Sequence, residues 1–259
     1  MISEKSLARI KKSSAQVKRP VRLVLFTTDT NCAACPDALE LVRAIKAQKG
    51  RMAVELYDMV MDRDKSEQYG VKQVPAIVVQ GAENQAVTFY GVAEDLFLEA
   101  LLNVIQAISD GKAWFPGEVR RALDLLSHDA RIRVFVENDC ASCLPVAETA
   151  IGMALESPKV YTDIVIASDF PELAKKHGVA SVPKTVFGEK LYKDGPVSES
   201  EFLELIFQSE GEKPRPERRC LSCGNPSPDV ICAACKTRIQ AEAVEHKLKS
   251  EKLKKPETM

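Results

Sequence analysis

The sequence predicts an α/β protein built from two tandem units, each with a mixed central sheet and helices on both faces, followed by a small C-terminal metal-binding knot and helix. Three observations lead to this prediction. Segments of strand and helix character alternate through residues 1–210. Their order occurs twice, at a spacing of 108 residues. All 8 cysteines fall into Cys-x-x-Cys pairs, two far apart and two close together near the C-terminus.

An internal duplication organises the chain. A shift of 108 positions lays Cys32 on Cys140 and Gly70-Val71 on Gly178-Val179. Both halves therefore carry Cys-x-x-Cys and then Gly-Val-x-x-Val-Pro, with 43 positions from the first cysteine to the proline. Such agreement in spacing indicates a repeated structural unit.

The first unit is expected to begin with a helix over Ser3–Val17. A Val- and Leu-rich strand follows at Val21–Thr27, and apolar residues at helical spacing predict a helix from Cys32 to about Gly50. The later elements are expected as a strand at Ala53–Met59, a short helix at Lys65–Tyr69, a strand after Pro75, a strand at Ala86–Tyr90 and an amphipathic helix from Glu94 to about Ser109.

The second unit follows the same order. Gly111, Trp114 and Pro116 interrupt the helical pattern and mark the join. Its elements are expected as a helix at Gly117–Leu126, a strand at Ile132–Val136, a helix from Cys140, a strand at Tyr161–Ile166, a helix at Pro171–Lys176, strands around Thr185–Phe187 and Lys190–Tyr192, and a helix at Glu199–Phe207. The predicted domains are therefore 1–112 and 113–210, with a linker at 211–219 and a tail module at 220–259.

Bulk composition narrows the function classes. The chain is 45% hydrophobic and 28% charged, as in globular proteins, and its apolar runs are too short to cross a bilayer. A net charge of −1 and a weakly basic tail do not indicate a nucleic-acid partner. The basic segment 1–19 is interpreted as a first helix in preference to a transit peptide, so we expect a cytoplasmic protein. No nucleotide-binding fingerprint is present, and no nucleotide cofactor is expected.

The two repeated pairs, Cys32/Cys35 and Cys140/Cys143, have the context of redox sites. Between a strand and a helix, the helix dipole and unpaired N–H groups favour a thiolate on the first cysteine. We expect Cys32 and Cys140 to attack substrate disulfides, and Cys35 and Cys143 to resolve the mixed disulfides. The Ser142 hydroxyl is placed to stabilise a nearby thiolate, whereas Asp139 opposes its ionisation. A structural disulfide or partial metal site is the alternative interpretation.

The repeated Val-Pro completes a resemblance. Cys-x-x-Cys followed by Val-Pro resembles the thioredoxin fold, and two such units resemble the glutaredoxin-like protein disulfide oxidoreductases over about residues 1–210. The resemblance implies two thioredoxin-like domains with cis prolines at Pro75 and Pro183, and a substrate peptide paired to the backbones of Val74 and Val182. The chain departs from thioredoxin at Phe26, where thioredoxins usually carry a buried acid. Lys184, after the second proline, is expected to favour acidic partners.

The last two pairs differ from the first two, since no strand or Val-Pro follows them. They are close together, and turn-forming residues lie between them, which suits two knuckles on one tetrahedral ion. We expect structural zinc, with iron as the second choice and a third redox site as the alternative. The predicted ligands are Cys220, Cys223, Cys232 and Cys235.

Together these patterns predict a dithiol–disulfide oxidoreductase acting on protein disulfides, with roles in electron transport and cell redox homeostasis. Its expected electron donor is a flavoprotein of the thioredoxin-reductase kind. Two alternatives stay open: an electron carrier between a flavoprotein reductase and a peroxidase, and a zinc-dependent adaptor that uses thioredoxin folds for docking.

Overall fold

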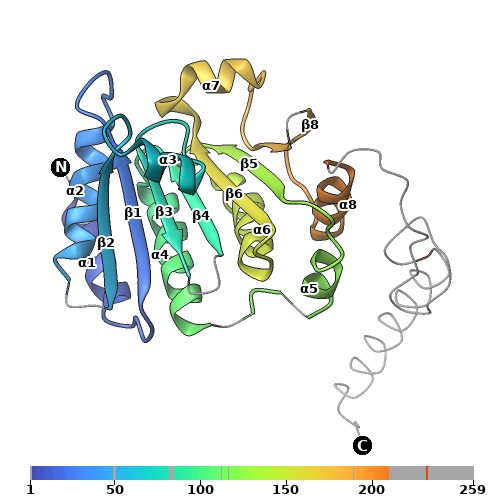
Figure 1. Ribbon diagram of the computed structural model, residues 1–259, viewed down its shortest axis with the longest axis horizontal. Coiled ribbons are helices and arrows are strands. Elements are labelled where there is room, and N and C mark those ends of the chain that lie inside the picture. Colours follow the sequence, from blue (N-terminus) through green and yellow to red (C-terminus); the bar gives the residue numbers. More distant parts are fainter. Residues whose placement is uncertain are drawn as a thin grey trace, which may run out of the picture. The chain divides into compact units, whose positions relative to one another are not determined.

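A single eight-stranded sheet carries both repeats (Figure 1). The computed structural model describes residues 2–48, 51–81, 85–111, 113–115, 117–188, 190–209 and 232. The strand order is β2-β1-β3-β4-β6-β5-β7-β8. The strands are β1 (Val21–Thr27), β2 (Met52–Asp58), β3 (Ala76–Gln80), β4 (Ala86–Tyr90), β5 (Ala130–Val136), β6 (Val160–Ile166), β7 (Lys184–Phe187) and β8 (Leu191–Asp194).

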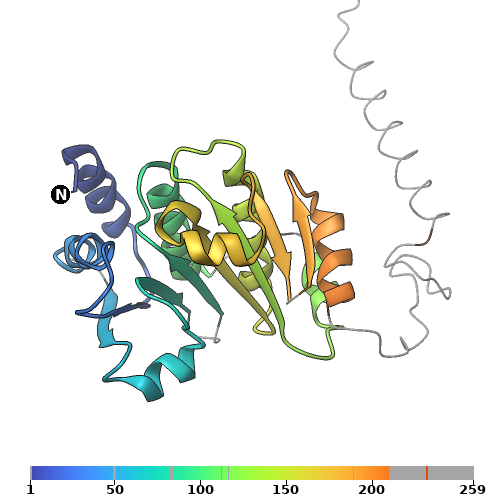
Figure 2. The same cartoon turned by 90° about the horizontal axis from the view of Figure 1, so that it is seen from above.

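Helices cover both faces of this sheet, as predicted. They are α1 (Glu4–Ser14), α2 (Cys35–Lys46), α3 (Arg63–Tyr69), α4 (Asp95–Asp110), α5 (Gly117–Leu123), α6 (Cys143–Glu156), α7 (Pro171–Lys176) and α8 (Glu199–Ser209), with a short 3₁₀ helix η1 (Ala167–Asp169). In the view from above, α3 lies on the opposite side of the sheet from α1 and α4 (Figure 2). None of the helices in the described part of the chain is long and apolar enough to cross a membrane.

Two apolar clusters on opposite faces hold the sheet between them. Side chains alternate along each strand, so Leu23 and Leu25 face one cluster whereas Val24 and Phe26 face the other. The larger cluster lies under α1, α2, α4, α5, α6 and α8, and the smaller lies under α7 and the loop after α3. The predicted mixed α/β architecture, with helices on both faces of a central sheet, is confirmed.

Each repeat contributes four strands in the same arrangement. β1 pairs parallel with β2 and antiparallel with β3, and β5 pairs in the same senses with β6 and β7. The repeats join where β4 pairs parallel with β6. Residues 1–211 thus form one compact unit, and the predicted division at 112/113 falls in the connection between α4 and α5. That division stays a prediction.

The two redox helices begin later than predicted. Both were expected to start at the first cysteine of a pair, but α2 starts at Cys35 and α6 at Cys143. Proline explains the difference. Pro36 and Pro145 fall in the first turn of these helices, where a missing N–H breaks no hydrogen bond. Helices that began at the first cysteine would place both prolines in the interior.

Candidate active sites

The first site is a disulfide at the start of α2. Cys32 and Cys35 are bonded, with their Cα atoms 5.4 Å apart. Cys32 is half-buried in the turn before the helix, whereas Cys35, the first helical residue, is only 5% exposed. The backbone N–H of Cys35 donates to the carbonyl of Cys32 at 3.4 Å, which closes the turn. The first sulfur is therefore the more accessible one.

The second site repeats this geometry at the start of α6. Cys140 and Cys143 are bonded, with their Cα atoms 5.3 Å apart. Cys140 is half-buried and Cys143 is fully buried. The Ser142 Oγ lies 3.4 Å from the Cys140 Sγ, so the expected hydroxyl contact is present. Ala34 occupies the matching position at the first site and has no hydroxyl.

A cis-proline loop accompanies each disulfide, as the resemblance implied. The Val74–Pro75 and Val182–Pro183 peptide bonds are both cis. Each proline directly precedes a strand, β3 or β7, that runs antiparallel to the strand leading into the cysteines. The proline and the disulfide of each repeat therefore lie at the same edge of the sheet. The binding of substrate by these loops stays a prediction.

Both sites open on that one edge. The cysteine loops follow β1 and β5, which are four strand positions apart in the sheet. Neighbouring strands lie about 4.8 Å apart, so the loops are separated by roughly 19 Å. The two disulfides are consequently distinct centres, each with its own proline loop.

The repeat is interrupted by one residue before the first site. In the strand register Phe26 faces Ala76 and Phe135 faces Lys184, so the equivalent phenylalanines are 109 positions apart. The cysteines are 108 apart, so the loop before Cys32 holds one residue more. Asn31 has φ 56°, a left-handed conformation that asparagine tolerates well, and this suits the extra residue.

Buried phenylalanines hold equivalent strand positions before both sites. Phe26 and Phe135 are fully buried in the smaller apolar cluster. Phe26 packs against the rings of Tyr57 and Tyr69, at centroid distances of 5.6 and 5.7 Å. Neither phenylalanine can accept a proton, so proton transfer must use another group or solvent.

Lys184 does not offer its charge to a partner, contrary to expectation. The residue is 5% exposed. Its Nζ donates to the carbonyl oxygen of Gly178 at 3.0 Å and lies 3.2 Å from the Asp194 carboxylate. The ammonium group also lies 4.5 Å from the centroid of the Tyr192 ring. These contacts turn the cation inward.

Asn138 connects the second site to the first repeat, and no sequence pattern indicates this role. Its side-chain carbonyl accepts from the N–H of Glu94 at 2.9 Å, and its side-chain amide donates to the carbonyl of Val92 at 3.0 Å. Its own carbonyl accepts from the N–H of Leu96 at 3.3 Å. The residue lies two positions before Cys140, so these bonds hold the second cysteine loop against the loop between β4 and α4.

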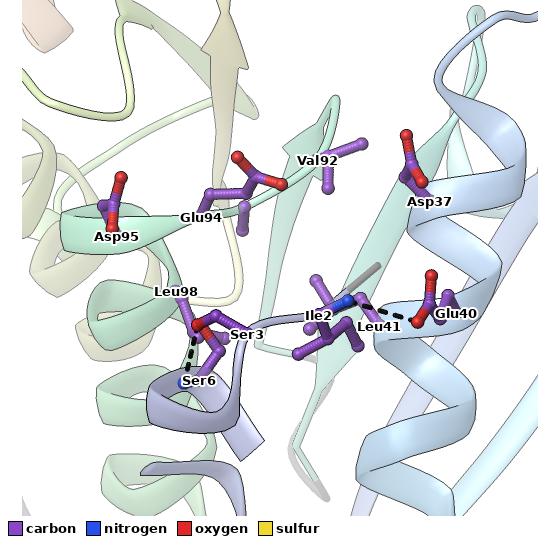
Figure 3. A pocket seen from close by; sticks show the side chains of 11 residues that line it. Ile2, Ser3, Ser6, Asp37, Glu40, Leu41, Val92, Glu94, Asp95 and Leu98 are labelled. Carbon is purple, nitrogen blue, oxygen red and sulfur yellow. Dashed lines mark hydrogen bonds between the residues drawn. The ribbon is translucent and has the colours of Figure 1, made fainter. Parts of the chain in front are cut away.

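An acidic pocket of about 220 Å³ lies beside the first redox helix (Figure 3). Its apolar side is formed by Ile2, Leu41 and Leu98. Four carboxylates line it, from α2 on one side and from the start of α4 on the other: Asp37, Glu40, Glu94 and Asp95. The N–H of Ile2 donates to Glu40 Oε1 at 3.1 Å. Cationic groups near the first site are thereby favoured.

The predicted metal module lies almost wholly outside the described residues. Cys220, Cys223 and Cys235 are not among them, and Cys232 is half-buried. Elsewhere in the described chain, no group of three or more His, Cys, Asp or Glu side chains is arranged to hold a metal ion.

Comparisons with known proteins agree with this geometry. A family model described as "Thioredoxin domain" matches residues 23–103 and 130–208, one match in each repeat. A protein of Methanothermobacter marburgensis described as "Probable Thioredoxin" is 38% identical over 89 residues, which covers 33% of this chain and 98% of that protein.

Solved structures show a similar double fold. A protein disulfide oxidoreductase from Aeropyrum pernix superposes with a TM-score of 0.72 at 24% identity, covering 80% of this chain and 94% of its own. The N-terminal domain of alkylhydroperoxide reductase AhpF from Enterococcus faecalis superposes with a TM-score of 0.70 at 18% identity, covering 80% of this chain and 100% of its own.

The predicted class of activity is confirmed by the family and the sites together. Two thioredoxin-like repeats, each with a Cys-x-x-Cys disulfide at the start of a helix, make the chain a thiol–disulfide oxidoreductase. With both repeats matched by the same family model, the chain belongs to the thioredoxin domain family.

Proposed function

We propose that the chain exchanges disulfides with protein substrates at both sites, with Cys32 and Cys140 as attacking thiols and Cys35 and Cys143 as resolving thiols. The observation that supports this assignment is the difference in burial between the two cysteines of each pair. The first cysteine is half-buried in a turn, whereas the second is nearly or fully buried in a helix. Only an accessible sulfur can reach a sulfur of a folded partner.

Each site would work by the same two exchanges. The thiolate of the first cysteine attacks one sulfur of the substrate disulfide, which forms a mixed disulfide and releases one substrate thiolate. The second cysteine then attacks the first, which restores the internal disulfide and releases the other substrate thiolate. Two electrons pass to the substrate, and each released thiolate takes a proton from solvent. The cycle runs in reverse when the substrate is a dithiol.

The proline loops are proposed to hold the substrate during these steps. Val74 and Pro75 lie at the same edge of the sheet as the first disulfide, and Val182 and Pro183 lie at the same edge as the second. A backbone N–H and carbonyl next to the attacked sulfur can pair with an extended peptide, as an added strand would. This pairing would recognise backbone and leave the choice of side chains to the surroundings of each site.

A flavoprotein reductase is the proposed electron donor, because regeneration of the dithiols needs two electrons that this chain does not itself generate. The structural likeness to the AhpF domain extends over 80% of this chain. It motivates the narrower proposal of an electron carrier from such a reductase to a peroxidase. We propose a cytoplasmic setting, where a reducing environment would keep the sites in turnover.

The tail is proposed to hold one structural zinc ion. Four thiolates from Cys220, Cys223, Cys232 and Cys235 are a donor set that zinc prefers, and metal binding would supply folding energy to a short polar segment. A zinc-dependent adaptor is the competing function, in which thioredoxin folds serve only for docking.

Two measurements test these proposals. Reduction of a protein disulfide by the Cys32→Ser variant and by the Cys140→Ser variant should each lose part of the activity, and the double variant should lose all of it. Full activity in the double variant would contradict the assignment of attacking thiols.

A count of zinc ions and free thiols on the intact chain separates the oxidoreductase from the zinc-dependent adaptor. One zinc with two cycling thiol pairs supports the enzyme, and two zincs with every thiol blocked support the adaptor.

A further inference from the structure

Each proline loop has a glycine neighbour in the same position. The N–H of Gly91 donates to the carbonyl of Pro75 at 3.0 Å, and the N–H of Gly195 donates to the carbonyl of Pro183 at 2.8 Å. Both glycines follow the last strand of their repeat, β4 or β8, and both have positive φ. Each glycine therefore lies directly beside its proline loop.

The surroundings of the two glycines differ. A Cβ placed on Gly91 would lie 2.5 Å from Asp169 Oδ2 and 3.0 Å from the Cβ of Ile166. The N–H of Val92 donates to the same Asp169 oxygen at 2.8 Å, and this hydrogen bond holds the Asp169 side chain beside Gly91. At Gly195, no atom within the described part of the chain lies within 4 Å of such a Cβ. Asp169 and Ile166 thus crowd Gly91, whereas no described residue crowds Gly195.

A second pair of equivalent glycines shows the same difference. Gly70 and Gly178 each end the helix that leads toward a proline loop. A Cβ on Gly70 would lie 2.9 Å from a guanidinium nitrogen of Arg131, whereas nothing among the described residues approaches Gly178 within 4 Å. The second repeat thus covers the first at two places, and its own equivalent places are uncovered.

Sheet topology explains the asymmetry. β4 pairs with β6, which brings η1 (Ala167–Asp169) directly beside the end of β4. β8 holds the equivalent place in the second repeat, and it is the last strand of the described sheet.

From this difference we infer that the second site accepts disulfides within extended polypeptide segments, whereas the first site accepts compact disulfides and discriminates against long flanking chain. The inference rests on the proposed function. Successive residues of an extended chain are about 3.3 Å apart, so two residues on one side of a disulfide reach about 7 Å. That length exceeds the spacing between β4 and β6, the strand that precedes η1, which is about 4.8 Å. A peptide leaving Pro75 in that direction meets Asp169, whereas one leaving Pro183 passes over Gly195, which no described residue covers.

The test compares two reagents with the same reacting bond. One is a neutral peptide of about ten residues whose central cysteine carries nitrothiobenzoate in a mixed disulfide, and the other is N-acetylcysteine amide carrying the same group. Attack on the cysteine sulfur releases the coloured nitrothiobenzoate thiolate in both cases, and the resolving thiol then releases the peptide or the amino-acid thiol. Flanking chain is the only difference between the reagents, so the ratio of the two rate constants reports access.

The measurement uses reduced full-length chain with one site at a time. The variant with Cys32→Ser and Cys35→Ser keeps the second site, and the variant with Cys140→Ser and Cys143→Ser keeps the first. We expect the peptide-to-amino-acid rate ratio to be at least about tenfold lower at the first site, a difference of about 1.4 kcal/mol in activation free energy. Equal ratios at the two sites, or a lower ratio at the second, would overturn the inference. Absence of reaction with the small reagent at both sites would instead overturn the proposed function.

Two substitutions of Asp169 separate the effect of its side-chain volume from the effect of its charge. In the variant that keeps the first site, Asp169→Gly removes the side chain beside Gly91 and should raise the peptide-to-amino-acid ratio severalfold. Asp169→Asn keeps the volume and an oxygen that can accept from Val92, so the ratio should stay low. A ratio that stays low in Asp169→Gly would overturn the Asp169 side chain as the cause. A ratio that rises equally in both variants would show that the volume of the side chain at position 169 is not the cause, and would overturn steric exclusion.

Discussion

Arg131 donates to both carboxylate oxygens of Asp163 across neighbouring strands, at 3.1 and 3.0 Å, next to the place where the two repeats join. The Asp163 side chain is only 2% exposed. Arg133 adds a third bond to the same carboxylate at 3.2 Å. Burial and the nearby Asp163 charge together raise the pKa of Tyr90 on the adjacent strand, which keeps its hydroxyl neutral. One buried carboxylate thus pairs with two guanidinium groups in the middle of the sheet.

Replacement of that carboxylate should strongly destabilise the protein. Asp163→Asn leaves two partly buried guanidinium groups without a counter-charge, and we expect the free energy of unfolding to fall by about 3 kcal/mol. Chemical denaturation of the intact chain measures the change. Glu67→Gln is the matched control, since it breaks an exposed Arg63–Glu67 pair with a 2.9 Å contact, and it should cost no more than about 0.5 kcal/mol. Equal effects of the two substitutions would contradict a structural role for the buried pair.

Glu156 should stabilise the connection between α4 and α5, which links the two repeats. Its side chain, 1% exposed, accepts hydrogen bonds from the N–H groups of Trp114 and Phe115 and from Arg120 Nε. These contacts fix the connection between the repeats onto the end of α6. Glu156→Gln replaces one acceptor oxygen by a donor, so we expect the free energy of unfolding to fall by about 2 kcal/mol. The control is Glu118→Gln, whose partner Arg121 is 3.9 Å away at the surface. A thermal scan that ranks the two variants in the opposite order would refute this account.

Most of the architecture was predictable because local pattern and repeat spacing agree. The alternation of strand and helix, the two cysteine pairs and the two Val-Pro steps depend on short-range preferences that the sequence displays directly. The start of each redox helix was misplaced, although Pro36 and Pro145 carry the necessary information. A proline tolerated only in a first turn locates that turn.

The contacts between the repeats were not predictable from pattern. Asn138 binds backbone groups of Val92 and Glu94, and backbone groups have no sequence signature. The wall that Asp169 forms beside Gly91 likewise depends on the pairing of β4 with β6. Equivalent residues in a repeat share local structure, but their neighbours differ wherever one repeat ends against the other. The functional differences between the sites arise from those neighbours.

The hydroxyl of Ser142 provides a test of the difference between the two thiols. Removal by Ser142→Ala should raise the pKa of the Cys140 thiol, because a donor to the thiolate is lost. Ala34→Ser introduces a hydroxyl at the matching position of the first site and should lower the pKa of the Cys32 thiol. The measurement is the pH dependence of alkylation of the reduced single-site variants by iodoacetamide. An unchanged Cys140 profile in Ser142→Ala would show that the 3.4 Å contact does not persist in the dithiol.

Glu148 should make stability depend on pH through a raised pKa. Partial burial on α6 is the larger cause of this shift, and the charge of Glu99 on α4 is the smaller. A carboxyl whose folded-state pKa exceeds its unfolded value binds protons more readily when folded. Its contribution to stability is therefore fully present below the unfolded pKa and is lost as the pH rises through the folded pKa. Relative to Glu148→Gln, the native chain should become less stable as the pH rises from the ordinary glutamate pKa, about 4.3, through the raised folded-state pKa. The loss should be less than about 1 kcal/mol because the group is partly solvated. Denaturation curves of both proteins at several pH values measure this difference.

Glu99→Gln should weaken the pH dependence of stability without abolishing it, since Glu148 stays partly buried. Complete loss of the pH dependence in that variant would assign the pKa shift to the charge of Glu99 alone.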